Sequence, residues 1–167
     1  MASPTGTFDV RSRVFAHFYD RVLAPSELAG LADRRRDLIA GATGRTLEIG
    51  AGTGLNVDHY PQGVESLVLS EPDSRMAQRL RRRVAERPRE AFIEIVECDA
   101  EALPFPDGSF DTVVCTLVLC TVPDPQRTLA EVERVLAPGG QLLFLEHVLG
   151  EGSTARWQKV MARPWSA

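Results

Sequence analysis

A short glycine-rich segment directly behind an apolar run constrains this chain most. The sequence TLEIGAGTGLN runs from Thr46 to Asn56 and contains Gly50, Gly52 and Gly54. Such a segment either makes a tight turn between a strand and a helix, or it brings the backbone close to a ligand, because glycine has no Cβ atom. One glycine is enough for a turn, so the sequence favours a ligand site.

Strand-like and helix-like segments alternate along the rest of the chain. Short apolar or alternating runs predict strands at 45–49, 66–71, 91–97, 111–119 and 141–148. Capping residues and helical spacing predict helices over 26–40, briefly after the glycines, over 73–87, and from Asp124 to the APGG segment, with a core stripe of Leu129, Val132 and Leu136. This alternation is typical of βαβ units, so we expect an α/β fold with a doubly wound, Rossmann-like parallel sheet.

Composition and charge narrow the function classes. The 167 residues carry a net charge of -4, which gives no reason to expect nucleic acid as a partner. The arginine runs 34–36 and 79–83 are interpreted as solvated helix faces. The start shows no signal peptide, and no apolar run approaches the roughly 18 residues that span a bilayer. We expect a cytoplasmic protein without a membrane anchor, and the cysteines and histidines show no metal-binding spacing.

Acidic residues lie near the predicted carboxyl ends of the first three strands, where ligands bind in this fold class. Glu71 ends the second strand, and its carboxylate can accept hydrogen bonds from both hydroxyls of a ribose. Asp99 follows the third strand and can accept from an adenine amino group, while the Ala100 N–H faces a ring nitrogen. Glu48 lies inside the first strand, where a buried carboxylate needs a partner, such as a ligand ammonium group or its water.

The glycine pattern does not identify the ligand by itself. The dinucleotide fingerprint is GxGxxG, and its last glycine corresponds here to Leu55. The observed GxGxG spacing weakens a nicotinamide dinucleotide as the ligand without excluding it.

Four segments together resemble a known family. LEIGAGTG, LSEPDS, CDAEALPFPDGSFDTVV and EVERVLAPGGQLLFLEH are similar, in order over residues 45–148, to the motifs of class I S-adenosylmethionine-dependent methyltransferases. The segments VVCTLVLCTV and LEHV, with Trp157 and Gln158, resemble the thiol methyltransferase group and its bacterial relatives.

The resemblance implies S-adenosyl-L-methionine as cofactor, a small-molecule acceptor and the sheet order 3-2-1-4-5. It implies that the methionine part of the cofactor passes Gly50, Ala51, Gly52 and Gly54, with Glu48 behind its amino group. It further implies that Glu71 holds the ribose, that Asp99 and Ala100 hold the adenine, and that Thr116 and Leu117 line the sulfonium side.

The function hypotheses remain open at this point. The first is methyl transfer to a small acceptor, with a thiol as the candidate that the resemblance suggests; the others are a nicotinamide-dependent oxidoreductase and a cofactor-binding domain without turnover. His147, after the fifth strand, is a candidate base for an oxygen or nitrogen nucleophile and is equally well interpreted as a structural histidine. A thiol ionises easily enough to need little help.

We expect a single domain over 1–167, with a helical cap at 1–41, a cofactor-binding core at 45–148 and a short tail at 149–167. The family fold continues after the fifth strand with a helix and a hairpin of strands six and seven, which the tail is too short to form. The strand at 141–148 would then be an unpaired apolar edge. This predicts either a homodimer through strand five or a shortened version of a longer enzyme, with weak or no turnover.

Overall fold

The computed structural model of this chain describes residues 27–86 and 92–146. Most of the predicted helical cap, the candidate base His147 and the tail lie outside these residues. The glycine segment and the acids that follow the strands all lie within them.

A five-stranded parallel sheet forms the centre of the described structure, in the order β3-β2-β1-β4-β5. This confirms the predicted order. The strands are β1 (Gly44–Ile49), β2 (Val64–Ser70), β3 (Phe92–Val96), β4 (Phe110–Thr116) and β5 (Leu136–Leu145). β1 pairs with β2 on one side and with β4 on the other, so the glycine segment leaves the sheet between β2 and β4.

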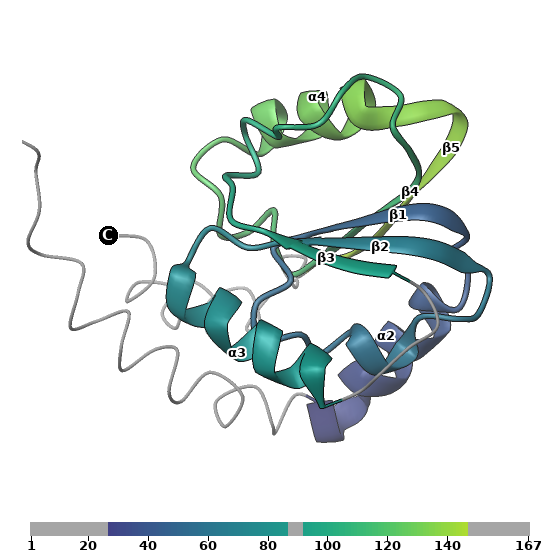
Figure 1. The fold of residues 1–167 in the computed structure, drawn as a ribbon, viewed down its shortest axis with the longest axis vertical. Coiled ribbons are helices and arrows are strands. Elements are labelled where there is room, and N and C mark those ends of the chain that lie inside the picture. Colours follow the sequence, from purple (N-terminus) through teal and green to yellow (C-terminus); the bar gives the residue numbers. More distant parts are fainter. Residues whose placement is uncertain (1–26, 87–91, 147–167) are drawn as a thin grey trace, which may run out of the picture.

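Helices cover both faces of the sheet (Figure 1). They are η1 (Glu27–Leu31), α2 (Ala32–Ile39), η2 (Val57–His59), α3 (Ser74–Ala85) and α4 (Pro125–Val135). One apolar cluster lies between the sheet and the helices α2 and α3, and it includes Ile39 and Leu80. The other lies between the sheet and α4, and it includes Phe110 and Val132. The two layers account for the near-continuous apolar runs of the inner strands.

The ends of the two long helices follow from their sequences. The Asp73 carboxylate accepts from the N–H groups of Arg75 and Met76, at 2.8 and 3.0 Å, and so caps α3. Asp124 caps α4 in the same way, with Pro125 as the first helical residue. Both caps satisfy N–H groups that have no partner inside the helix.

The largest departures from the prediction are at two boundaries and in the buried stripe of α4, of which Val132 alone was predicted correctly. β4 ends at Thr116 rather than at residue 119, because Leu117 has φ +59° and turns the chain out of the sheet. The APGG segment belongs to β5, which begins at Leu136 with an irregular register against β4. The buried stripe of α4 consists of Thr128, Val132 and Val135, whereas Leu129 is 40% exposed.

β5 is the outer strand on its side of the described sheet, and its Phe144 side chain is 58% exposed. The pairing of this strand with another chain stays a prediction. Over the described ranges, no helix combines the length and the apolar character that crossing a membrane requires.

Candidate functional site

All three glycines after β1 adopt backbone conformations that disfavour a side chain. Gly50, Gly52 and Gly54 have φ values of +63°, +58° and +85°. The Ala51 N–H donates to the Ser70 carbonyl at 2.9 Å, and this bond ties the segment to the end of β2. The expectation that one glycine would suffice for the turn was therefore wrong, since the turn itself uses three.

The glycines differ in what surrounds them. A Cβ atom on Gly50 would lie 2.7 Å from Cγ2 of Val118, and one on Gly54 would lie 2.6 Å from Cδ1 of Leu80 on α3. Gly50 and Gly52 line a cavity, whereas Gly54 packs against α3 and lines neither of the two cavities beside the glycine segment. Gly54 therefore serves packing, and the other two also face the space a ligand would use.

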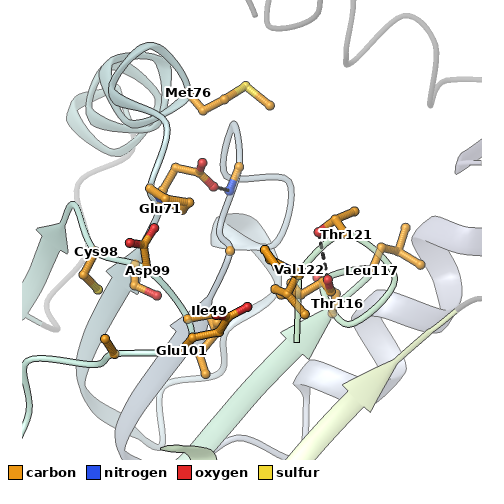
Figure 2. A pocket seen from close by; sticks show the side chains of 18 of the residues that line it. Ile49, Glu71, Met76, Cys98, Asp99, Glu101, Thr116, Leu117, Thr121 and Val122 are labelled. Atoms are coloured by element: carbon orange, nitrogen blue, oxygen red, sulfur yellow. Dashed lines mark hydrogen bonds between the residues drawn. The ribbon is translucent and has the colours of Figure 1, made fainter. Parts of the chain in front are cut away.

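The larger cavity has a volume of about 560 Å³ and lies at the carboxyl edge of the sheet (Figure 2). This is within the usual range for a small-molecule site. It brings together seven of the predicted site residues, namely Gly50, Gly52, Glu71, Asp99, Ala100, Thr116 and Leu117. Figure 2 shows Glu71, Cys98 and Asp99 toward one end and Thr116, Leu117 and Thr121 toward the other.

Glu71 is 7% exposed and is held by the backbone on both sides. One carboxylate oxygen accepts from the Gly52 N–H at 2.9 Å, and the other accepts from the Asp73 N–H at 3.0 Å. Burial raises the pKa of Glu71. Each oxygen retains acceptor capacity after these bonds, so the fixed carboxylate can still accept from two ligand hydroxyls.

The segment that carries Asp99 and Ala100 is anchored by α4. The Arg134 guanidinium donates to the carbonyls of Leu103 and Phe105, at 2.9 and 2.7 Å, and Glu131 accepts from the Leu103 N–H at 2.8 Å. Sequence reasoning did not single out Arg134 or Glu131. Their i, i+3 spacing on a helix is a weak signal for such an anchor.

A buried polar cluster lies beneath the glycine segment and consists of Arg35, Glu48, Asn56, Tyr60 and Thr116. Glu48 accepts from the Asn56 amide at 2.8 Å and from the Tyr60 hydroxyl at 2.7 Å. Its expected need for a partner is thus met within the protein. Burial is the main cause that raises its pKa to about 7, against the opposing effects of these hydrogen bonds and of the Arg35 charge.

Arg35 comes from α2 and is 4% exposed, so its assignment to a solvated helix face was wrong. Its Nη1 donates to Asn56 Oδ1 and to Thr116 Oγ1, at 3.1 and 3.0 Å. The Asn56 amide also donates to Thr116 Oγ1, at 2.8 Å. These two donors use the acceptor capacity of the Thr116 hydroxyl, which is left as a hydrogen-bond donor.

A second, much smaller cavity of about 20 Å³ adjoins this cluster. Glu48 and Ala51 line it and not the larger cavity, while Gly50, Gly52 and Thr116 line both. Of the three predicted residues that are absent from the large cavity, Glu48 and Ala51 therefore still face a space beside it, whereas Gly54 does not. That space can hold about one water molecule or a small group of a ligand.

Residues 47–144 match the model of a family described as the methyltransferase domain. The match covers more than half of the chain, and the chain therefore belongs to this family of S-adenosylmethionine-dependent methyltransferases.

Several relatives are similar to this chain. The human thiol S-methyltransferase TMT1B is 39% identical over 155 residues, which cover 86% of this chain and 63% of that protein. The phosphatidylethanolamine N-methyltransferase of Cereibacter sphaeroides is 36% identical over 121 residues, covering 72% and 59%. The chain thus spans less than two thirds of the length of both relatives.

Among solved structures, a SAM-dependent methyltransferase of Thermotoga maritima superposes with a TM-score of 0.60. It is 28% identical, and the alignment covers 89% of this chain and 69% of that one. None of these relatives supports the nicotinamide alternative.

Proposed function

We propose that this chain transfers a methyl group from S-adenosylmethionine to a small-molecule acceptor. The observation that carries the proposal is the cavity whose wall joins Gly50 and Gly52 to the backbone-held carboxylate of Glu71. A fixed carboxylate beside an open glycine backbone suits a ligand with a ribose and a charged amino-acid end. The cofactor would supply an already activated methyl group, and the protein would mainly bind and orient the reactants.

The geometry supports an assignment of roles along the cavity. Glu71 would hold the ribose hydroxyls, and Asp99 with the Ala100 N–H would hold the adenine. Gly50 and Gly52 would pass the methionine part, with Glu48 and Ala51 beside its amino group in the small adjoining cavity. Thr116 and Leu117 would then lie at the sulfonium end.

The Glu71→Ala variant tests the cofactor site. Loss of hydrogen bonds to a charged group costs roughly 1.5–3 kcal/mol, so the affinity for S-adenosylhomocysteine should fall by about ten-fold or more. Isothermal titration calorimetry measures this directly. Glu97→Ala is the matched control, since Glu97 follows the neighbouring strand and forms an exposed pair with Arg81 outside the cavity. A folded Glu71→Ala variant with unchanged affinity would remove Glu71 from the site.

A thiol is the acceptor class that the sulfonium end supports best. The described residues of the turn that line this end, from Thr116 to Val118 with Thr121 and Val122, carry no carboxylate and no imidazole. Glu101 also lines the cavity, and its carboxylate accepts from the Asp124 N–H at 2.8 Å. A thiol needs little help to lose its proton, unlike an alcohol or an ammonium group. The Thr116 hydroxyl, left as a donor, suits an acceptor that carries negative charge, such as a thiolate.

Methyl transfer to a panel of small thiols, phenols and amines tests the acceptor class. We expect thiols to be methylated, with a rate that rises with pH as the thiol ionises. The nitrogen acceptor named for the Cereibacter relative makes amines the critical comparison. Methylation of amines or phenols without methylation of thiols would contradict the thiol assignment and leave the cofactor assignment intact.

A further inference from the structure

The turn after β4 contains a strained residue. Leu117 has φ +59°, and it is the one non-glycine residue with positive φ in the described ranges. This conformation is strained for a leucine, and it persists only when its surroundings hold it there. Its N–H donates to the Leu145 carbonyl at 2.8 Å, so the end of β5 forms part of those surroundings.

Glu146, directly after β5, also holds the turn in place. Its Oε1 accepts from the N–H groups of Val118 and Leu119, at 2.7 and 2.8 Å. These are the first two N–H groups after the strained residue. One carboxylate oxygen therefore holds both, in charge-assisted bonds that are stronger than neutral ones.

Within residues 27–86 and 92–146, the other oxygen of Glu146 makes no such bond, which bears on why an acid stands at this position. Oε2 is buried, and across the described residues it has no hydrogen-bond partner. A buried carboxylate oxygen left unpaired is costly, so burial alone gives no reason for an acid at this position. The double acceptance by Oε1 gives one, because a charged acceptor stabilises two N–H groups of a strained turn more than a neutral acceptor does.

The turn also forms a wall of the site. Thr116, Leu117, Val118 and Thr121 all line the large cavity. Figure 2 shows Thr116, Leu117 and Thr121 at the end opposite Glu71 and Asp99. Val118 packs closely on Gly50, because a Cβ atom on Gly50 would lie 2.7 Å from Cγ2 of Val118. A change in the turn would therefore move both the acceptor end and its contact with the glycine segment.

We propose that Glu146 is a positioning residue, which holds the strained turn from Leu117 to Thr121 in the conformation that shapes the acceptor end of the cavity. It acts through the backbone of the turn and touches neither reactant. Its link to turnover rests on the proposed function, whereas its hold on the turn does not.

Amide hydrogen exchange on the Glu146→Ala variant tests the hold on the turn. We expect the amides of Val118 and Leu119 to exchange about ten-fold faster or more, and those of Glu146→Gln to exchange at intermediate rates, because its carbonyl oxygen can still accept both bonds. Glu131→Ala is the matched control, since Glu131 accepts from the Leu103 N–H on another wall and should affect that amide instead. Unchanged exchange at residues 118 and 119 in a folded Glu146→Ala variant would overturn the proposal.

A double-mutant cycle with Leu117→Gly tests the role in turnover. Glycine adopts φ +59° without strain, so the turn should depend less on Glu146 in that background. We expect Glu146→Ala to lower kcat/KM for the acceptor by about ten-fold in the wild-type background and by about three-fold or less in the Leu117→Gly background, and any loss of S-adenosylhomocysteine affinity to be smaller in the Leu117→Gly background as well. Equal losses in both backgrounds would show that Glu146 supports the fold in general and would overturn its role in holding the strained turn. Absence of S-adenosylhomocysteine binding by the wild type would instead contradict the proposed function and leave the exchange result as the test of Glu146.

Discussion

Replacement of Gly52 by valine is expected to abolish binding of S-adenosylhomocysteine, with a loss of affinity of about 100-fold or more. Gly52 has φ +58°, a conformation that a β-branched residue strongly resists, and it lines both cavities beside the proposed methionine end. Its N–H also donates to Glu71. A shift of the backbone to relieve strain would therefore displace the proposed ribose-binding carboxylate, and a side chain that remained in place would occupy ligand space.

Gly139→Val is the control for backbone strain alone, without a change at the binding site. Gly139 has φ +81°, and a Cβ atom there would meet nothing within 4 Å. It lines neither cavity, so this variant should pay a similar conformational cost and still bind S-adenosylhomocysteine. Calorimetric titration of both variants, after circular dichroism has shown that each is folded, makes the comparison. Normal binding by Gly52→Val would mean that the glycines serve only the turn.

The sheet order followed from the family resemblance, whereas one end of the candidate site could be predicted from the residue pattern itself. Parallel strands joined by helices bring their carboxyl ends to one edge, so acids that directly follow predicted strands must gather there. Glu71 and Asp99 accordingly line one cavity with Gly50 and Gly52. This inference needs only strand positions and the direction of the chain, both of which short apolar runs and caps reveal.

The other end depends on contacts that leave little local trace. Arg35 reaches Thr116 across 81 positions of sequence, and the flanking arginines of its run are exposed. Charge alone predicts that all three arginines of residues 34–36 face solvent, and only the packing of α2 shows that Arg35 points inward. Leu117 lies in an apolar run that continues smoothly from β4, so its positive φ is invisible in the residue pattern. The sequence predicts a role for His147 and none for its neighbour Glu146, because bonds to the backbone N–H groups of Val118 and Leu119 leave no mark on the residue pattern.

Glu48→Gln is expected to make the protein more stable above pH 7 by up to about 3 kcal/mol. The carboxyl group of Glu48 is 1% exposed, and burial raises its pKa from the ordinary 4.5 to about 7. A glutamine side chain can accept from the Asn56 amide and donate to the Tyr60 hydroxyl, so it replaces both hydrogen bonds without a buried charge. Arg35 and Glu71 are the charged groups that act on this site, the first favouring ionisation and the second opposing it.

The sign of the pH dependence follows from proton uptake. Between pH 4.5 and about 7 the folded protein keeps a proton on Glu48 that the unfolded chain has lost. The stabilisation from this raised pKa is fully present below pH 4.5 and is lost as the pH rises through about 7. The wild type should therefore lose stability across this range, whereas Glu48→Gln should lack this contribution. The two proteins should differ little at pH 5 and most at pH 8.

Urea unfolding at pH 5, 6, 7 and 8 measures the difference, with Glu133→Gln, an exposed carboxyl on α4, as the matched control. Glu48→Gln should also bind S-adenosylhomocysteine about ten-fold more weakly, because a neutral side chain no longer attracts the ammonium group proposed beside residue 48. A gain in stability with a loss of affinity would show that the buried charge is retained for the ligand at the expense of the fold. A gain without any loss of affinity would leave Glu48 outside the binding site. Equal stability of variant and wild type at pH 8 would show that the polar cluster already compensates the charge.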